Sequence, residues 1–373
     1  MSTRLPSIIN RVLLPGLAFK AVVIGGGYAT GRELAEFFLP AGPVGGLLGM
    51  ALAMVIWSVA CTLTFVFAYE TRSSDYRAFF GQLLGRWAIT FEIAYFAFLI
   101  LVLAVFGAAS GAIGQALFGW PPVAGTLVLA AAILAVVIGG QGAVERLFKL
   151  VSLFLYAVYI IFFVLTFSRF GALIDEHLRT PVPISGWFAG GVTYASYNVI
   201  GAVLILPVLR HLTSRKDAVI AGILCGPLAI APGLLFFTCL LAFYPGINSQ
   251  ELPSDFILRA LQRPLFHVTF EAMVFFALLE SSVGFVHAFN ARLAALYRSR
   301  GRETPVAVRV LVPTAIVIGA MFVAAAVGLV ELIAKGYRAM AVAIIAIFIL
   351  PLCTIGIVKL LKRWPWDPSP RSY

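Results

Sequence analysis

Charged residues are scarce in this sequence. Only 12% of its 373 residues are Asp, Glu, Lys or Arg, whereas 61% are apolar and the mean hydropathy is +1.01. Soluble domains carry about 25% charged residues, so the composition excludes an ordinary soluble protein. The apolar residues form runs of about 20 or more, the length that a helix needs to cross a bilayer. The sequence therefore predicts an all-α integral membrane protein.

Several motifs are also absent, and each absence argues against a class of protein. There is no GxxxxGK[ST] phosphate-binding loop, so ATP is not the expected energy source. Without an HExxH or GxSxG motif we expect neither an enzyme nor an organic cofactor, and nothing resembles a channel filter. The four cysteines lie in apolar runs without paired spacing, which indicates no disulfide framework and no thiolate metal site.

What is present are ten candidate membrane spans, separated by charged or Pro/Gly-rich interruptions. They cover residues 11–39, 43–69, 86–118, 121–140, 143–168, 186–212, 217–244, 265–298, 305–329 and 331–361. Two amphipathic segments, 71–85 and 251–262, are predicted as interfacial helices, the second with Ser254 or Asp255 as its N-cap. The second is either an ordinary connector or a lid over a substrate path.

The basic residues are distributed unequally between the two sides of the membrane. With the N-terminus in the cytoplasm, 19 Lys and Arg residues fall inside and 6 outside. This asymmetry predicts that both termini are cytoplasmic and that the protein lies in the cytoplasmic membrane. Loop charges thus account for the net charge of +11, and we expect no nucleic-acid partner. Lys20, inside the first span, is expected to extend toward the cytoplasmic water.

The first and sixth spans resemble each other. The first contains Tyr28-Ala29-Thr30 and, later, Leu39-Pro40; the sixth contains Tyr194-Ala195-Ser196 and, later, Leu206-Pro207. Because each half then has five spans, an odd number, the two halves must enter the membrane from opposite sides. The sequence predicts one domain, 1–373, made of two inverted five-helix repeats, 11–168 and 186–361.

A break in the helix is predicted in both of these spans, at Gly25–Gly31 and at Thr193–Gly201. Close helix packing explains one glycine of the Gly25-Gly26-Gly27 triplet, but not all three, since they lie on different faces. Unwound backbone survives in a membrane only beside protein or a polar cavity, where its N–H and C=O groups bind ligands. The predicted substrate-binding residues are Gly25, Gly26, Gly27, Tyr28, Ala29, Thr30, Gly31, Glu33, Tyr194, Ser196, Tyr197 and Asn198.

The segments "GGGYATGRELAEFF" and "YNVIGAVLILPVLR" resemble the YkvI-type membrane proteins of the amino acid–polyamine–organocation (APC) superfamily. The resemblance covers essentially the whole chain and implies the five-plus-five inverted-repeat LeuT fold, with helices 1 and 6 broken. It implies no particular substrate. The chain has no Asp-Pro-Gly in span one and no Met-Pro-His in span six, which argues against divalent-metal transport.

Charged residues inside the spans need a partner or a function, because a charge near a helix centre costs roughly 2.5–3.5 kcal/mol. Arg32 and Glu36 are spaced to pair along one helix face. Glu33 is rotated by about 100° from Arg32 and is predicted to face a cavity. In the eighth span, Glu271 lies near the outer end, where it is expected to reach water, and Glu280 lies near the middle.

Ser281 and Ser282 follow Glu280 directly. Serines in membrane helices commonly bond their own backbone. The resemblance to sodium-coupled transporters implies instead that these two hydroxyls bind Na⁺ together with carbonyls near Val23 and Gly26. Glu280 is not part of that pattern, so the coupling ion is either Na⁺ or a proton.

These observations predict an ion-coupled secondary transporter that moves a small amino acid or related zwitterion by alternating access. The substrate carboxylate would meet N–H groups near Gly27–Gly31, and tyrosines and Asn198 would line the pocket. The alternatives are a carrier of organic amines or other small solutes and a sensor with a transporter fold. The expected partners are a small-molecule substrate and the lipid bilayer, and the oligomeric state is left open.

Overall fold

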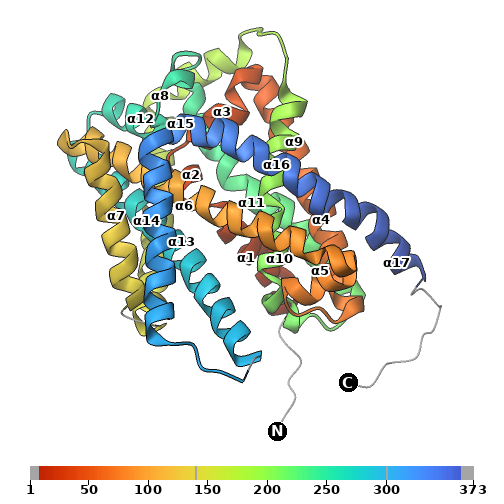
Figure 1. Ribbon diagram of the computed structural model, residues 1–373. Helices are drawn as coiled ribbons and strands as arrows, with labels where there is room; N and C mark the ends of the chain where they lie inside the picture. The colour runs from red at the N-terminus through yellow and green to blue at the C-terminus, as the bar shows by residue number, and fades with distance from the viewer. Residues whose placement is uncertain (1–7, 139–140, 300, 363–373) are drawn as a thin grey trace.

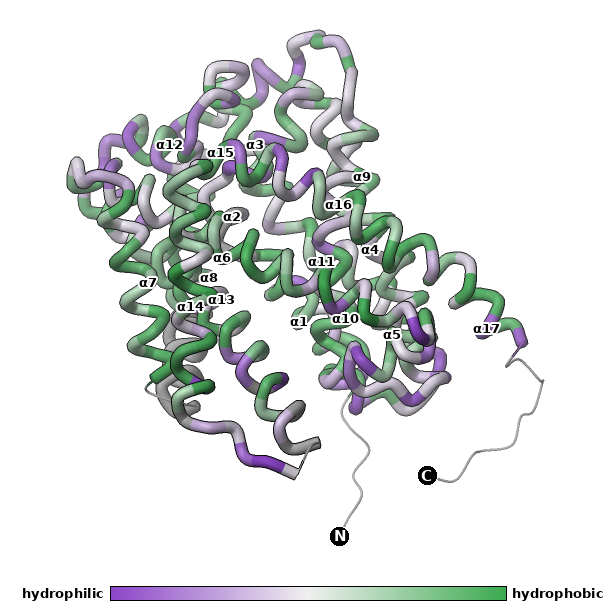
Figure 2. The backbone as a smooth tube through the Cα atoms, viewed as in Figure 1, coloured by the Kyte–Doolittle hydropathy of each residue, from purple (hydrophilic) through white to green (hydrophobic). Residues whose placement is uncertain are grey.

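The computed structural model describes residues 8–138, 141–299 and 301–362, and it is all-helical over these ranges. Figure 1 shows α5 and α12 at opposite ends of the helix bundle, which we call the α5 end and the α12 end. The hydrophobic residues follow the middle of the helices, and hydrophilic residues gather toward the two ends (Figure 2). This distribution is typical of a protein that spans a membrane. The predicted fold class is confirmed.

The helices follow the predicted spans closely. The first span comprises α1 (Leu14–Val23), α2 (Gly26–Ala29) and α3 (Arg32–Phe37). The others are α4 (Gly42–Thr71), α5 (Tyr76–Leu84), α6 (Ala88–Phe118), α7 (Pro122–Ile138), α8 (Gln141–Arg179), α9 (Trp187–Asn198), α10 (Ile200–Leu204), α11 (Arg215–Leu241), α12 (Pro253–Leu261), α13 (Pro264–Ser299), α14 (Val306–Val327), α15 (Leu329–Glu331), α16 (Arg338–Ile344) and α17 (Ile357–Lys362).

Seven helical segments of the described chain are long and apolar enough to cross a membrane. A shorter apolar helix, α7, adds one crossing. The two remaining predicted crossings are the interrupted ones, α1–α3 and α9–α10, whose pieces are too short individually. The described helices therefore accommodate the ten predicted spans. The fifth is longer than expected, because α8 continues to Arg179.

The break predicted in the first span is confirmed. α1 ends at Val23, Gly25 is extended, and Gly31 has a left-handed φ of +76°. Between these two interruptions α2 forms a single turn. A Cβ at Gly31 would also lie 3.0 Å from the Phe236 ring, so both conformation and space favour glycine there.

The break predicted in the sixth span is wrong in extent. Thr193–Asn198 is helical, and the interruption is confined to Val199, where hydrogen bonding changes from an i−4 to an i−3 pattern. The physical reason is local. Ser196 and Asn198 donate to carbonyls four residues earlier, an arrangement that the helix itself supplies. The next glycine in the chain, Gly201, is a single residue, so it is no counterpart of the glycine triplet in the first span.

Both predicted interfacial helices form, as α5 and α12. Asp75 caps α5, since its carboxylate accepts from the N–H groups of Arg77 and Ala78. The cap predicted for α12 is wrong: Leu252 is the N-cap residue, and Ser254 and Asp255 lie inside the helix. Both side chains are buried there and are available for contacts with other elements.

Close packing of α4 against α11 and α9 forms the frame around the interrupted spans. A Cβ at Gly226 of α11 would lie 2.2 Å from the Met54 carbonyl oxygen of α4. Such close backbone approach is the usual way in which membrane helices pack. The indole of Trp57 donates to the Ala195 carbonyl at 3.0 Å and fixes α9 against α4.

Candidate functional site

A cavity of about 510 Å³ lies beside the break in the first span. Its walls come from the end of α1, from α6, from α9–α10 and from the residues Ala277–Ala288 of α13. Glu33 and Tyr337 lie on its lining, and so does Lys20 from α1. The size is typical of a site for a small ligand.

Glu33 is the predicted cavity residue, and the structure places it there. Glu33 is only 5% exposed, and its Oε2 accepts a hydrogen bond of 2.7 Å from the Tyr197 hydroxyl. The Tyr197 ring stacks on Tyr337 with centroids 4.5 Å apart. A carboxylate in such surroundings needs a proton, a cation or further donors to compensate for lost hydration. Glu33 is therefore suited to hold a cationic group of a ligand or a proton.

Arg32 serves a different purpose from its neighbour Glu33. The predicted pair with Glu36 is confirmed, with Nη2 and Oε2 2.6 Å apart. Nη1 donates to the carbonyls of Asn248 and Gln250, both at 2.8 Å. Arg32 thus holds the segment after α11 over the start of α3, at the α12 end.

A backbone hydrogen bond reinforces this closure of the α12 end. The N–H of Ser254 in α12 donates to the carbonyl of Thr30 at 3.1 Å. This carbonyl belongs to the junction between α2 and α3, where regular helical bonding is interrupted. Thr30 is accordingly part of the contact between α12 and the break, and it is not on the cavity lining.

Of the residues predicted in the sixth span, Tyr197 and Asn198 line the cavity. Asn198 is 8% exposed, and its Nδ2 donates to the Tyr194 carbonyl at 3.0 Å. Tyr194 and Ser196 do not line it. The Tyr194 ring packs on Phe38, 4.9 Å between centroids, and the Ser196 hydroxyl donates to its own helix. The prediction that they bind substrate is not supported by their surroundings.

The residues predicted in the first span are also divided. Gly25 lines the cavity, whereas Tyr28, Ala29 and Gly31 do not. The Tyr28 ring is 2% exposed and packs against Phe236. The surroundings of Gly26 and Gly27 lie outside the described part of the chain, and their role stays a prediction.

The predicted ion site is brought together in part. Val23, Glu280 and Ser281 line the same cavity, and α2 packs against α13. The Val23 carbonyl accepts from the Gly25 N–H at 2.8 Å. Ser282 is fully buried and is not on the cavity lining, and its hydroxyl has no hydrogen-bond partner among the described residues. The coupling-ion role of these residues, with Gly26, stays a prediction.

One charged residue of the cavity, Lys20, is not among the residues predicted to line it. Its Nζ donates to the Tyr156 hydroxyl of α8 and lies 4.3 Å from the centre of that ring. Both residues line the cavity. A lysine within an apolar run was the available signal, but only the packing of α1 against α8 shows where it points.

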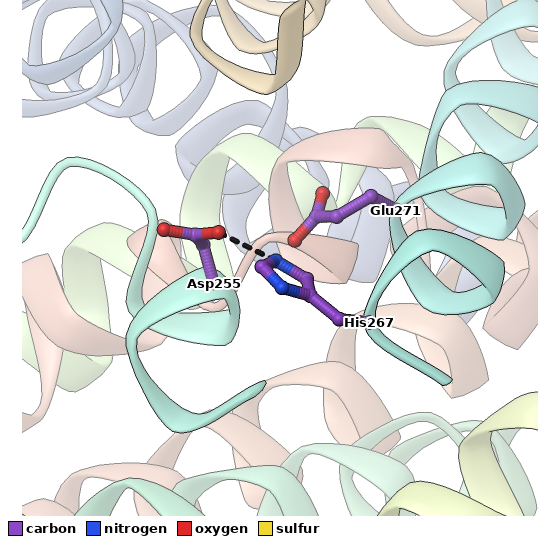
Figure 3. Close-up of side chains that lie close together, drawn as sticks. All are labelled: Asp255, His267 and Glu271. Carbon is purple, nitrogen blue, oxygen red and sulfur yellow. Dashed lines mark hydrogen bonds and ion pairs between the residues drawn. The ribbon is translucent and has the colours of Figure 1, made fainter. Parts of the chain in front are cut away.

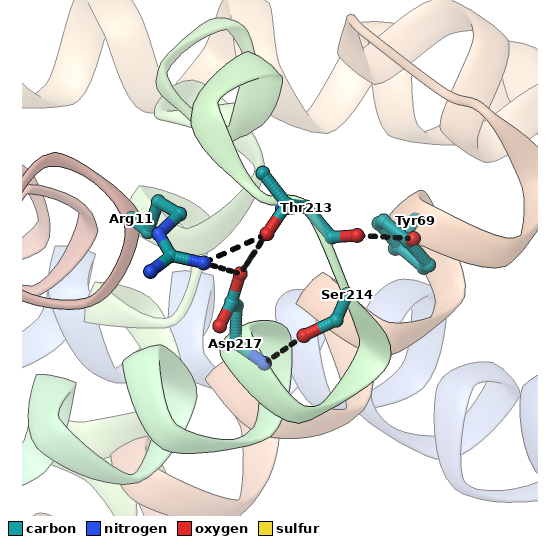
Figure 4. A network of polar contacts seen from close by, with 5 residues as sticks. All are labelled: Arg11, Tyr69, Thr213, Ser214 and Asp217. Atoms are coloured by element: carbon teal, nitrogen blue, oxygen red, sulfur yellow. Dashed lines mark hydrogen bonds and ion pairs between the residues drawn. The ribbon is translucent and has the colours of Figure 1, made fainter. Parts of the chain in front are cut away.

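At the α5 end, a polar network joins the start of the first span to the segment that follows the sixth (Figure 4). Arg11 Nη1 donates to the Thr213 hydroxyl at 2.9 Å and lies 3.5 Å from the Asp217 carboxylate. Asp217 accepts from Thr213, and the Ser214 hydroxyl accepts from the Asp217 N–H. Tyr69 of α4 donates to the Thr213 carbonyl. The two interrupted spans are thus tied together at this end.

The chain matches no family model and no curated protein. Solved structures match along nearly its whole length. MhsT in complex with L-phenylalanine shares 16% identity at a TM-score of 0.54, over 97% of this chain and 99% of that one. A substrate-bound Na⁺-coupled sialic acid symporter shares 12% at 0.51, over 93% and 86%.

A manganese transporter from Eremococcus coleocola, in complex with an aromatic bis-isothiourea substituted compound, shares 15% identity at a TM-score of 0.53, over 92% and 78%. At such identities the likeness is one of fold. The chain is a multi-span membrane protein with a LeuT-like fold.

Proposed function

We propose that the protein is an ion-coupled secondary transporter that carries a small amino acid or related zwitterion across the cytoplasmic membrane. The observation that carries this proposal is the cavity at the break of span one, into which Glu33, Tyr197 and Asn198 are brought. MhsT in complex with L-phenylalanine, a sialic acid symporter and a manganese transporter share this fold. This likeness supports a transport function.

In this proposal the amino group of the substrate meets Glu33 and the hydroxyl of Tyr197. The substrate carboxylate meets backbone N–H groups after Gly25 and the amide of Asn198, which has a second N–H to donate. Phe98, Val102 and Phe106 of α6 provide an apolar wall for the side chain. A pocket with a few placed polar groups in apolar surroundings suits a small zwitterion.

The two five-span halves, 11–168 and 186–361, are proposed to move against each other as inverted repeats. The α12 end is closed by Arg32, by the Ser254–Thr30 hydrogen bond and by the stack of Tyr197 on Tyr337. The cavity lining extends instead along α13 toward its later residues. If the basic loops and both termini are cytoplasmic, this is an inward-facing state.

One specific observation favours a second candidate substrate. Two carboxylates, Glu33 and Glu280, line the cavity together with the aromatic rings of Tyr95, Tyr197 and Tyr337. Aromatic faces and carboxylates bind quaternary or primary amines through cation–π and ionic contacts. An organic amine is therefore the alternative ligand.

A thermal-shift screen of the purified protein against amino acids, organic amines and nucleobases, with and without Na⁺, tests the ligand class. An amino acid that stabilises the chain should also be taken up into proteoliposomes under an ion gradient. Glu33→Gln should reduce this uptake at least about 10-fold, since one lost charged hydrogen bond is worth about 1.5–3 kcal/mol. Glu303→Gln, on an exposed carboxylate, is the matched control. Ligand binding without uptake under any gradient would favour the sensor alternative.

The coupling ion is tested by two further variants. Under Na⁺ coupling, the combined Ser281→Ala and Ser282→Ala change abolishes Na⁺-stimulated uptake, and Glu280→Gln weakens it only partly. Under proton coupling, Glu280→Gln uncouples uptake from the pH gradient and the serine changes have little effect. We favour Na⁺, because two hydroxyls with backbone carbonyls supply the oxygen ligands that a hard cation needs. Gradient-driven uptake that survives all of these changes would rule out this ion site.

A further inference from the structure

A second polar cluster lies at the α12 end, away from the cavity. It consists of Asp255 on α12 and of His267 and Glu271, one turn apart on α13 (Figure 3). His267 Nε2 and Asp255 Oδ1 are 2.7 Å apart, and one side-chain atom from each of the three residues lies within 4.8 Å of the others. None of the three lines the central cavity. The cluster is therefore separate from the proposed transport site.

Glu271 is the residue that the fold leaves unexplained. The sequence suggests that it reaches water, but the residue is 0% exposed. Neither of its carboxylate oxygens has a hydrogen-bond partner among the described residues. Figure 3 shows the carboxylate directed at the His267 ring and the Asp255 carboxylate. A buried carboxylate without donors is costly, and a bound cation removes that cost.

Arg259 does not provide this cation. Its Nε lies 2.8 Å from Asp255 Oδ2, and its side chain is 59% exposed. This contact occupies one oxygen of Asp255 and leaves Oδ1 turned toward His267. It also orients the Asp255 carboxylate, as second-shell partners of metal ligands do.

We propose that Asp255, His267 and Glu271 bind a divalent transition-metal ion of the Zn²⁺ class, with water as the fourth ligand. One imidazole nitrogen and two carboxylate oxygens are a donor set of Zn²⁺ sites, whereas Na⁺, Mg²⁺ and Ca²⁺ prefer oxygen alone. Tetrahedral bonds of about 2.1 Å put ligand atoms about 3.4 Å apart. The His267–Asp255 separation of 2.7 Å is shorter than that value, and the three ligand atoms all lie within 4.8 Å of one another, so small side-chain rotations complete the site.

Metal binding here has a structural consequence. It joins α12 to the start of α13, and α12 also donates the Ser254 hydrogen bond to Thr30 at the break of span one. An occupied site therefore holds α12 over that break and stabilises closure of the α12 end. The cluster therefore links α12 to α13 and is not a second substrate site.

The test uses the full chain in detergent, first stripped with a chelator and then given Zn²⁺. We expect about one Zn²⁺ per chain to remain after desalting and the melting midpoint to rise by about 3 °C or more. Mg²⁺ at the same concentration should give neither effect. His267→Ala and Glu271→Gln should each lose both effects. His177→Ala is the matched control, because it removes another of the four histidines, at the end of α8, and should retain both.

The proposal is overturned if the wild-type chain retains no Zn²⁺, or if His267→Ala retains as much as the wild type. Should Glu271→Gln not fold, Co²⁺ titration of the wild-type chain decides instead. Intense visible bands of four-coordinate Co²⁺ support the site, and the weak spectrum of hydrated Co²⁺ contradicts it. None of these readouts depends on transport, so failure of the transport proposal would leave this result intact.

Discussion

The two interrupted spans are built differently, although the sequence makes them look alike. The first is divided twice, at Ile24–Gly25 and at Thr30–Gly31, with one helical turn between. In the stretch Thr193–Gly201, where the sixth span is predicted to unwind, the interruption lies at Val199 alone. In the proposed function, the first span offers backbone groups to the substrate, while the sixth presents the side chains of Tyr197 and Asn198 from a regular helix.

This difference assigns different tasks to the two spans. A helix with satisfied backbone groups holds Tyr197 and Asn198 in fixed directions. The left-handed Gly31 instead allows α3 to change direction relative to α2 at little conformational cost. We infer that the first span moves more than the sixth during the transport cycle. This difference in movement between the two spans can be tested by substitution, beginning with the largest expected effect.

Gly31→Ala should be much more damaging than Gly201→Ala. A left-handed alanine costs about 1–2 kcal/mol, and its Cβ also meets the Phe236 ring at 3.0 Å. Gly201 is helical, so alanine gains about 1 kcal/mol in helix propensity, which offsets the close contacts of its Cβ with the side chains of Phe19 and Val22 at 3.2 Å. Melting midpoints of the two purified variants provide the comparison. Equal loss in both would show that the two breaks impose the same constraint.

Asn198→Ala should weaken ligand binding about 5–10-fold, through the loss of about 1 kcal/mol from one hydrogen bond. Ser196→Ala should leave the affinity unchanged, because that hydroxyl donates to the Val192 carbonyl of its own helix. The measurement is the ligand concentration needed for half of the maximal thermal shift. If the serine variant is the more affected one, the side chains assigned to the cavity are the wrong ones.

Asp217→Asn should have the smallest effect. It removes the charge from the network that joins the first span to the segment after the sixth (Figure 4). Arg11 and Asp217 are partly exposed, with side chains 25% and 13% accessible, and such pairs contribute about 0–1 kcal/mol. We expect a small drop in the melting midpoint and faster labelling of a cysteine introduced at the α5 end of the cavity. Unchanged labelling would mean that the network does not restrain the two spans.

Much of the fold could be predicted from composition and local pattern. Long apolar runs define spans whatever their neighbours are, and the glycine triplet marks a break because consecutive glycines disfavour a continuous helix. The i, i+4 spacing of Arg32 and Glu36 was enough to predict their ion pair. These features depend on residues close together in the chain.

The features that could not be predicted depend on distant segments. Tyr194 lies beside cavity residues in the sequence, but Phe38 and Trp57 enclose its ring. From the sequence Glu271 is expected to reach water, yet it is fully buried in the part of the fold where α12 packs against α13. The local pattern does not place Lys20 at the cavity, where its Nζ donates to the Tyr156 hydroxyl of α8. In each case the direction of a side chain is decided by a helix that the local pattern does not contain.

The contacts of Arg32 have a consequence for how related sequences can vary. Its guanidinium recognises the main-chain carbonyls of Asn248 and Gln250, and every amino acid carries such a carbonyl. The side chains at positions 248 and 250 can therefore be exchanged during evolution without loss of the contact. Arginine itself has no such freedom, because lysine lacks the planar fork that reaches two carbonyls and the Glu36 carboxylate at once. Natural variants should accordingly differ at positions 248 and 250 while they keep the arginine that binds these carbonyls.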